Sequence, residues 1–290
     1  MNLFVFGLGY TALKFIDLNR DCFVSVSGTV RDKNQAESLR KLGIGAHIWD
    51  GGPARANLAA AIAASDAIVV SVPPSEQGDR VLAGMRQQLR NAPDLGTAVY
   101  LSTVGVYGDH QGAWVDEDTP PHPSSERSRW RLRAEQDWCD LAAEKGINLH
   151  ILRLAGIYGP GRNAIESLRA GTARRIIKPG QVFNRIHVDD IAAAIRTCIL
   201  RPDGSRDGIW NIADDEPAPP QDVVAFAAQL LGVEPPPEIP LEEAELSVMG
   251  RSFYSEAKRV SNARMKDQLC VRLTYPTYRE GLAALLDQPI

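Results

Sequence analysis

The chain begins with a short motif whose residue types and spacing suit the binding of a dinucleotide pyrophosphate. Residues 7–12 read Gly-Leu-Gly-Tyr-Thr-Ala, a Gly-x-Gly-x-x-Ala turn. In such a turn Gly7 permits the sharp bend, Gly9 lets the backbone approach the phosphates, and the small Ala12 allows a helix to pack closely on a strand. The phosphates then lie at the helix N-terminus, where backbone N–H groups and the helix dipole attract anions.

An ordinary glycine turn has the same pattern, so the flanking residues must decide. The apolar residues 3–6 predict a strand that ends at the turn, and the spacing of Leu13, Phe15 and Ile16 predicts a helix over residues 11–18. This strand-turn-helix context favours a nucleotide site. The residues expected to contact the cofactor here are Gly7, Gly9, Tyr10, Thr11 and Ala12.

The end of the next predicted strand should meet the adenosine ribose. An acidic residue about 20 positions after the turn accepts hydrogen bonds from a free ribose hydroxyl, whereas an arginine accommodates a 2′-phosphate. Arg31 lies at this distance and Asp32 follows it. The sequence therefore favours NADP over NAD. The alternative is that Arg31 is a solvated cation and Asp32 binds the ribose.

Two further loops follow predicted strands and are candidate cofactor contacts. Asp50 has two interpretations: its carboxylate accepts a hydrogen bond from the adenine amino group, or Asp50 and the two glycines after it only shape a turn. Ser71, Val72 and Pro73 follow a fully apolar strand. We expect their backbone to pass beside the cofactor, in an extended loop that Pro73 and Pro74 favour.

The elements that must position these residues alternate apolar runs with helical segments, as in a parallel sheet. Near-continuous apolar strands suit a sheet covered on both faces. The expected strands are residues 23–30, 46–49, 67–72, 98–102 and 148–153, and the expected helices are residues 33–41, 54–64, 80–89 and 130–145. The predicted fold class is α/β, a Rossmann-type doubly wound parallel sheet with a smaller C-terminal substrate lobe.

This alternation changes after about residue 156, where Gly, Pro and Arg become frequent. A helix over residues 189–200 and a strand over residues 208–212 predict a return to the main sheet. We therefore expect a cofactor-binding domain of residues 1–160 together with 185–215. The expected smaller lobe comprises residues 161–184 and 216–290.

Composition excludes several classes of protein. The 290 residues, 44% of them hydrophobic, are enough for a large core, and the net charge of −4 disfavours a nucleic-acid binder. The four cysteines are far apart, which predicts neither a metal site nor a disulfide framework. No apolar run reaches the roughly 18 residues of a membrane span, and no leader precedes the first strand. We expect a cytoplasmic protein that binds small molecules, without membrane or nucleic-acid partners.

Three separated motifs occupy the middle of the chain. Residues 100–108 read Tyr-Leu-Ser-Thr-Val-Gly-Val-Tyr-Gly, residues 152–162 read Leu-Arg-Leu-Ala-Gly-Ile-Tyr-Gly-Pro-Gly-Arg, and residues 185–190 read Arg-Ile-His-Val-Asp-Asp. In this order they resemble the NAD-dependent epimerase/dehydratase family, the extended short-chain dehydrogenase/reductases. The later part of the chain looks like the atypical branch of that family. The resemblance implies an NADP-bound Rossmann domain, a lobe that closes over a substrate, often a nucleotide-linked sugar, and frequent pairing into a homodimer.

The resemblance also implies site residues. Thr103 matches the family's catalytic serine or threonine and, like Ala155, is expected beside the cofactor. The family's acid/base is a tyrosine in a Tyr-x-x-x-Lys pair on a helix that ends with a glutamate. Counting back from Glu135 places Arg127 at the tyrosine position and Arg131 at the lysine position, so this pair is replaced.

Arginine cannot take over the proton transfer of a tyrosine. The tyrosine works because neighbouring charge lowers its pKa toward neutral pH, whereas a guanidinium stays protonated. Arg131 can still bind the nicotinamide ribose through its fixed donors. The substitutes that we consider for the missing acid are Tyr107, Tyr158, His110, His122 and His187. The alternatives are packing or cofactor-contact roles for the two tyrosines and a helix N-cap at residues 187–190.

On the substrate side, the resemblance implies that Arg162 and Arg185 face an anionic substrate, possibly a diphosphate, which arginine binds bidentately. The alternative is a surface ion pair for each. Tyr107 and His187 complete the expected substrate contacts.

The sequence predicts two alternative functions. One is an NADP-dependent oxidoreductase or epimerase that acts on a sugar-nucleotide-like or small carbonyl substrate; the other is a catalytically silent NADP-binding sensor or scaffold.

Overall fold

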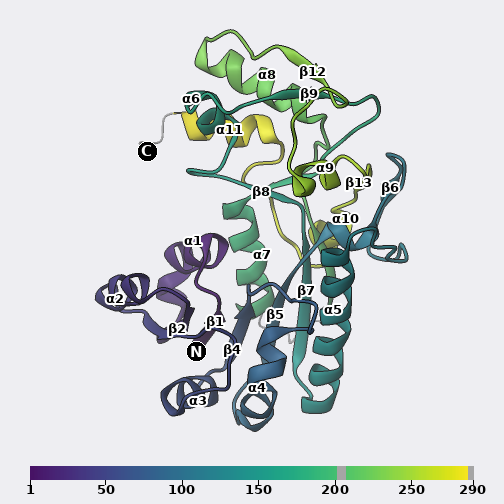
Figure 1. Ribbon diagram of the computed structural model, residues 1–290. Coiled ribbons are helices and arrows are strands. Elements are labelled where there is room, and N and C mark those ends of the chain that lie inside the picture. The colour runs from purple at the N-terminus through teal and green to yellow at the C-terminus, as the bar shows by residue number, and fades with distance from the viewer. Residues whose placement is uncertain (201–206, 287–290) are drawn as a thin grey trace. The chain divides into compact units, whose positions relative to one another are not determined.

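The computed structural model describes residues 1–200 and 207–286. Its main sheet has seven strands in the order β11-β7-β5-β4-β1-β2-β3 (Figure 1). The strands are β1 (Asn2–Phe6), β2 (Ser25–Val30), β3 (Gly45–Ile48), β4 (Ala67–Val70), β5 (Thr97–Thr103), β7 (Asn148–Leu154) and β11 (Gly208–Ile212). The pairs from β5 across to β3 are parallel. The predicted doubly wound Rossmann-type fold is confirmed.

The helices of this part of the chain follow the strands, as a parallel sheet requires. They are α1 (Tyr10–Asn19), α2 (Lys33–Lys41), α3 (Ala56–Ala63), α4 (Arg80–Asn91), α5 (Glu126–Lys145) and α7 (Val188–Leu200). Helices α3, α4 and α5 cover one face of the sheet, where Phe4 and Phe6 of β1 join a core that includes Leu58, Met85 and Trp138. Leu3 and Val5 of β1 are equally buried and, by the alternation of a strand, face the other side.

The boundaries of the elements differ from the predicted ones where polar residues hide the pattern. Helix α5 begins at Glu126, one turn before the predicted start at Trp130, because the first turn consists of charged and hydroxyl residues without apolar periodicity. Strand β2 begins at Ser25 because Phe23 follows a short 3₁₀ turn over Arg20–Cys22. Helix α2 and strand β11 have the predicted ends.

Contacts divide the chain into two compact units. The first comprises Met1–Thr103, Glu126–Arg153 and Ile191–Trp210, and the second comprises Val104–Ser125, Leu154–Asp190 and Asn211–Ile290. Residues 104–125 belong to the second unit because β6 (Trp114–Val115) pairs with β13 (Arg259–Val260). The limits near residues 160 and 215 that the sequence suggests both lie inside the second unit.

The second unit contains short parallel strand pairs and helices that the sequence pattern did not predict. Strand β8 (Gly156–Tyr158) pairs with β10 (Arg185–His187), and β9 (Arg175–Ile177) pairs with β12 (Glu238–Pro240). Its helices are α6 (Ala164–Arg169), α8 (Pro220–Leu231), α9 (Val248–Phe253), α10 (Ala263–Asp267) and α11 (Tyr278–Leu286). Apolar side chains of α6, α8 and α11 form the core of this unit. Most of these elements are too short for periodicity to reveal them.

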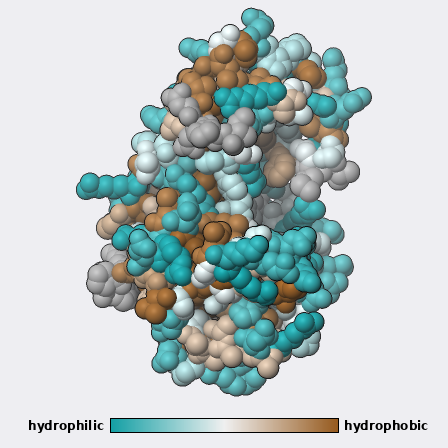
Figure 2. Space-filling model, turned by 90° about the vertical axis from the view of Figure 1, so that its left-hand side faces the viewer, coloured by the Kyte–Doolittle hydropathy of each residue, from teal (hydrophilic) through white to brown (hydrophobic). Residues whose placement is uncertain are grey.

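The surface seen in Figure 2 mixes hydrophilic and hydrophobic areas, and the hydrophobic ones form separate patches. Large exposed apolar side chains such as Leu18, Val24 and Leu42 fit this picture, since scattered apolar residues are normal on a protein surface. Among the described helices, none has the length and apolarity that a membrane crossing needs.

Candidate functional site

The turn between β1 and α1 is tightly held by the end of β2. Gly7 has a φ of +90°, in the region that favours glycine, and its N–H donates to Thr29 Oγ1 at 2.8 Å. The Leu8 N–H donates to the Thr29 carbonyl oxygen at 2.8 Å. These bonds fix the turn at the carboxyl ends of β1 and β2, where ligands bind in open α/β sheets.

The N-terminus of α1 is open toward solvent-accessible space. Gly9 is its N-cap, and no side chain caps the first turn. A Cβ atom added at Gly9 would meet nothing within 4 Å, whereas one added at Gly7 would lie 3.1 Å from the Val72 side chain. Ala12 is completely buried and Thr11 nearly so. The first turn of a helix carries unsatisfied N–H groups and a partial positive charge, so this geometry suits a phosphate.

A pocket of about 270 Å³ lies beside this turn. Seven of the expected cofactor residues line it: Gly7, Gly9, Arg31, Asp50, Ser71, Val72 and Pro73. They follow four different strands, and the fold brings them together because parallel strands end at the same edge of the sheet. Tyr10, Thr11 and Ala12 continue from the turn into α1. The pocket lies within the first unit and is the candidate cofactor site.

The residues after β2 give the pocket its charge. Arg31 is exposed and lines the pocket. Asp32 is the N-cap of α2, and its Oδ1 accepts a hydrogen bond from the Gln35 N–H at 2.7 Å. The Gln35 side chain in turn donates to the Leu8 carbonyl oxygen at 3.0 Å. Arg31 is therefore available to a ligand, while Asp32 is engaged by the helix.

Sequence reasoning missed several residues of this pocket. Trp49 follows β3, is 7% exposed, and its indole N–H donates to the Gly52 carbonyl oxygen at 2.6 Å. Arg80, the first residue of α4, brings a second cation to the lining. A helix start capped by Asp79 is visible in the sequence, but nothing there places Arg80 beside Arg31. Asp50 Oδ1 accepts from the Gly52 N–H at 3.3 Å, which shapes the turn and leaves its second oxygen to the pocket.

Thr103 and Arg131 lie in the same unit, at β5 and α5. Thr103 is the last residue of β5 and is half-buried. Arg131 Nη1 donates to the Leu101 carbonyl oxygen at 2.9 Å and to Tyr100 Oη at 3.2 Å, and its guanidinium lies 5.5 Å from the centre of the Tyr100 ring. The Arg131 side chain is thus a donor to β5. Arg127, one turn earlier, is exposed.

A buried ion pair fixes α5 on β5 and β7. Arg153 Nη2 and Nε donate to the two Glu135 carboxylate oxygens at 2.8 and 3.2 Å, and Ser102 Oγ also donates to Glu135. Both charged side chains are almost fully buried. Such a bidentate pair holds its partners in a defined geometry, so it fixes the backbone next to Thr103.

The remaining expected site residues lie in the second unit. Tyr107 is completely buried, and its hydroxyl donates to Asn211 Oδ1 at 2.8 Å. His187 is 1% exposed, and its Nδ1 accepts from the Asp189 N–H at 3.2 Å at the start of α7. The Ala155 N–H donates to the Ile212 carbonyl oxygen. Arg162 is exposed in the loop before α6.

Two aspartates of this unit have raised pKa values. Burial raises the pKa of Asp190 to about 6, against the hydrogen bonds that its carboxylate accepts from the N–H groups of Thr274 and Tyr275. Burial raises the pKa of Asp214 to about 8, which the positive charge of Arg185 partly offsets. Burial also raises the pKa of Tyr158 well above its ordinary value. None of these groups was a sequence-predicted acid except Tyr158, whose raised pKa disfavours proton exchange near neutral pH.

Comparison with known proteins identifies the family of the chain. The model of the NAD dependent epimerase/dehydratase family matches residues 57–213, more than half of the chain. The chain belongs to this family. Members of this family bind NAD(P), and the pocket at the glycine turn remains the candidate site for it. Among the described residues, no cluster of His, Cys, Asp and Glu has the arrangement of a metal site.

Three relatives are informative. A functionally unknown conserved protein from Silicibacter pomeroyi DSS is 45% identical, with a TM-score of 0.86 over 98% of each chain. Protein YeeZ of Escherichia coli K12 is 34% identical over 180 residues, 59% of this chain and 61% of that protein. A 3-diazoavenalumate denitrifying reductase of a Streptomyces species is 27% identical over 58% of each. The matches to these curated relatives span less than two thirds of their length.

Proposed function

We propose that the protein is an NADPH-dependent oxidoreductase that acts on a sugar-nucleotide-like or small carbonyl substrate. The observation that carries this proposal is the pair of cations in the candidate cofactor pocket, Arg31 and Arg80. A guanidinium binds a phosphate through two parallel hydrogen bonds. Two such groups in the lining of one pocket favour the cofactor that has an additional phosphate on its adenosine ribose, NADP, over NAD.

The position of Asp32 supports the same cofactor. An acidic residue at the end of this strand accepts hydrogen bonds from the ribose hydroxyls of NAD. Here Asp32 Oδ1 caps α2 through the Gln35 N–H, so this carboxylate is oriented toward the helix. The residue that remains directed to the ligand is Arg31.

We further infer that the tyrosine and lysine of the family's acid/base pair are replaced by Arg127 and Arg131. A guanidinium stays protonated at ordinary pH, and Arg131 is bonded to the backbone of β5. Burial raises the pKa of Tyr100, so the phenol next to Arg131 does not exchange protons near neutral pH. The proton that a reduced carbonyl oxygen needs would then come from solvent.

In this proposal the bound cofactor supplies a hydride to an electrophilic carbon of the substrate. Thr103 at the end of β5 would orient the substrate oxygen through its hydroxyl group, and that oxygen would take its proton from water as its bond to carbon becomes single. The Streptomyces relative is named a reductase, which supports reduction as the direction. The kinetic consequence is that no acid or base of the enzyme at the reacting oxygen adds a pH dependence to the rate between about pH 6 and 9.

A titration of the purified protein with NADPH and with NADH tests the cofactor proposal. We expect saturable binding of NADPH in the micromolar range and at least tenfold weaker binding of NADH. If neither nucleotide binds below millimolar concentration, the proposal is wrong. A preference for NADH would refute the proposed role of Arg31 and Arg80 in binding the 2′-phosphate. The proposal that the glycine turn binds the pyrophosphate would then still stand.

A turnover assay tests the proposed reduction of a carbonyl substrate. Oxidation of NADPH would be followed with a panel of sugar nucleotides and small carbonyl compounds, for the wild-type protein, Thr103→Ala and the matched control Thr103→Ser. We expect turnover that Thr103→Ala lowers at least a hundredfold and that Thr103→Ser largely retains. Equal rates for all three proteins would remove Thr103 from the reaction.

The second candidate function is a catalytically silent NADP-binding protein, a redox-state sensor or scaffold. The bond from Arg131 to β5 favours it, because a fixed guanidinium gives no proton transfer beside the nicotinamide. This alternative predicts tight NADPH binding without oxidation of NADPH by any member of the panel. Substrate-dependent oxidation that Thr103→Ala abolishes would refute it.

A further inference from the structure

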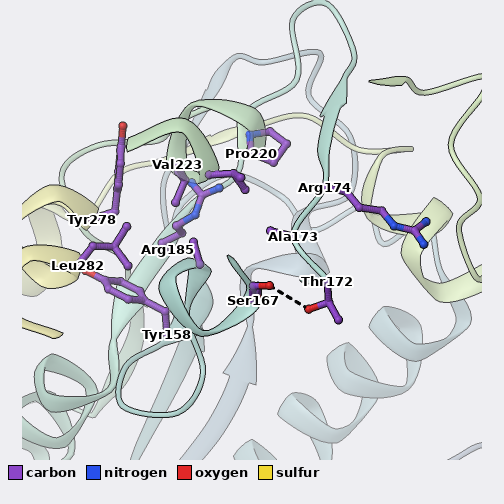
Figure 3. Close-up of a pocket in the computed structure, with 12 residues that line it drawn as sticks. Tyr158, Ser167, Thr172, Ala173, Arg174, Arg185, Pro220, Val223, Tyr278 and Leu282 are labelled. Atoms are coloured by element: carbon purple, nitrogen blue, oxygen red, sulfur yellow. Dashed lines mark hydrogen bonds between the residues drawn. The ribbon is translucent and has the colours of Figure 1, made fainter. Parts of the chain in front are cut away.

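The second unit contains a pocket of its own, of about 310 Å³, between α6, β10, α8 and α11 (Figure 3). This volume is at the small end of ligand pockets, which span roughly 300–1,000 Å³. All of its lining residues belong to the second unit. It is therefore distinct from the candidate cofactor pocket, whose lining residues all belong to the first unit.

Arg185 supplies the charge of this pocket. Its Nη1 donates to the carbonyl oxygens of Phe183 and Ala218 at 3.0 and 3.1 Å. These two bonds hold the guanidinium in place and use only one of its nitrogen atoms. No described residue accepts a hydrogen bond from Nε or Nη2, which form the edge that binds a carboxylate in a bidentate manner. The side chain is half-buried, so this edge is not sealed inside the protein.

The N-terminus of α8 lies next to the same guanidinium. In Figure 3 Arg185 projects toward the start of this helix, beside Pro220 and Val223. Pro219 is the N-cap, and no side chain caps the first turn of this 12-residue helix. The helix dipole places partial positive charge at this end, which adds to that of Arg185. Asp222 is the one acidic residue of the first turn, and it is exposed.

Arg185 is the one cation among the described lining residues whose side chain faces the pocket. Burial raises the pKa of Asp214 to about 8, so near neutral pH this neighbour of Arg185 is mostly protonated and leaves the guanidinium charge to a ligand. Burial also lowers the pKa of Arg185. Arg174, the other cation of the lining, points away from the pocket in Figure 3, and its Nη1 donates to the Glu245 carbonyl oxygen at 2.7 Å. The one free guanidinium edge, with a single positive charge, matches a monocarboxylate in both geometry and charge.

The remaining walls are mainly apolar or aromatic, and Ser167 and Thr172 add two hydroxyl groups. Val223 and Leu282 contribute aliphatic surface, and the Tyr278 ring lies 5.9 Å from the Arg185 guanidinium. The Tyr278 side chain is 1% exposed, and its hydroxyl has no hydrogen-bond partner among the described residues. In Figure 3 this hydroxyl points away from Arg185, so the part of Tyr278 that faces the guanidinium is its ring.

We propose that this pocket binds a small organic monocarboxylate with an apolar or aromatic body. The carboxylate lies on the Nε and Nη2 edge of Arg185 at the start of α8, and the body packs against Val223, Leu282 and Tyr278. The proposal concerns the second unit alone and does not depend on the cofactor function. It also differs from a sugar-nucleotide site, which would carry a diphosphate.

The probes that test the proposal are benzoate and 3-phenylpropionate, with benzamide as the uncharged analogue and inorganic phosphate as the anion without a body. Binding to the full-length protein would be measured by calorimetry and by saturation-transfer NMR. We expect both carboxylates to bind at least tenfold more tightly than benzamide and phosphate. Equal binding of benzoate and benzamide, or tighter binding of phosphate, would overturn the proposal.

Variants locate the site. Arg185→Met should weaken benzoate at least tenfold, whereas Arg174→Met should leave its affinity unchanged. Because Arg185 also bonds two carbonyl groups, its loss can impair folding, so Val224→Trp provides a second test by filling the pocket from a half-buried position of its lining. The matched control, Val224→Ala, should retain binding. Unchanged benzoate affinity in Val224→Trp would place the binding elsewhere and refute the proposal.

The binding of NADPH by each variant provides an independent measurement. It should be the same as in the wild-type protein, because none of the substituted residues lines the cofactor pocket. Loss of benzoate binding with retained NADPH binding would support the proposal. Benzoate binding without any NADPH binding would leave this proposal intact and refute the proposed cofactor function.

Discussion

Asp32 Oδ1 accepts a hydrogen bond from the Gln35 N–H at 2.7 Å, so the acidic residue next to Arg31 serves as the N-cap of α2. An aspartate in this position stabilises a helix by about 1 kcal/mol. The same residue is the one that a ribose hydroxyl would otherwise engage. The helix cap and the choice of cofactor are thus connected at one side chain.

The first prediction concerns Arg31. Arg31→Ala should weaken NADPH at least tenfold and leave NADH unchanged, because only NADPH carries the 2′-phosphate that a guanidinium binds. Arg80→Ala should act in the same direction. Arg86→Ala on the same helix, which lies outside the pocket and pairs with Glu144, is the matched control. Equal losses for the two nucleotides would show that Arg31 does not contact the 2′-phosphate.

The second prediction separates two glycines by what surrounds them. A Cβ at Gly9 would meet nothing within 4 Å, whereas one at Gly28 would lie 2.4 Å from the Val5 carbonyl oxygen. Gly9→Val should therefore keep the thermal midpoint of the wild-type protein and lose NADPH binding, because the side chain occupies the phosphate space. Gly28→Ala should lower the midpoint by several degrees, because β1 and β2 must separate. A Gly9→Val protein that binds NADPH normally would contradict the position of the pyrophosphate.

The third prediction concerns the buried pair of Glu135 and Arg153. Removal of one partner leaves a buried charge uncompensated, so Glu135→Leu should lower the free energy of unfolding by about 3–5 kcal/mol. The double variant Glu135→Leu/Arg153→Met should recover much of this loss, because an apolar pair of similar size needs no counter-charge. Chemical denaturation of the wild-type protein, the single variants Glu135→Leu and Arg153→Met, and the double variant measures the coupling. If the double variant were as unstable as the sum of the single ones, the pair would not act as a unit.

The fourth prediction is a dependence of stability on pH. Burial raises the pKa of Asp214 to about 8 and that of Asp190 to about 6, above the ordinary value near 4 of the unfolded chain. The folded protein therefore binds these protons more tightly than the unfolded chain does. The free energy of unfolding should be highest near pH 4 for these two groups and fall as the pH rises through 6 and 8.

Asp214→Asn isolates the larger of these two effects. It should flatten the decline between about pH 6 and 8, since an amide has no proton to lose. Asp267→Asn, at an exposed acid of the same unit, is the control that should leave the decline unchanged. Denaturant midpoints measured at intervals of one pH unit would decide. A decline that persists in Asp214→Asn would assign it to other groups.

The sequence predicted the sheet and the pocket beside it because both follow from local patterns. A Gly-x-Gly turn between an apolar strand and a helix, and loops at the ends of parallel strands, bring Gly7, Arg31, Asp50 and Ser71 to one edge. Arg80 and Trp49 were missed because their place in the pocket depends on how α4 and the loop after β3 pack. No short-range pattern encodes that contact.

The second unit was predicted poorly for a related reason. Its strands pair residues far apart in the chain, as Trp114 does with Arg259, and each strand is too short for alternation to be visible. The pairing of Asp190 with the backbone of Thr274 and Tyr275 is likewise encoded by no motif. The sequence predicted Arg185 only as a residue that binds an anion. The pocket around it could not be predicted, because it forms only when α6, α8 and α11 pack together.

The interleaving of the two units along the chain has a consequence for synthesis on the ribosome. The first unit needs Ile191–Trp210, and the edge strand β11 that pairs beside β7 ends at Ile212. Until that segment emerges, β7 is an unpaired and apolar edge, which is a hazard for association with other nascent chains. The glycine turn is made among the first residues, yet the sheet behind it is completed only after about three quarters of the chain has been translated.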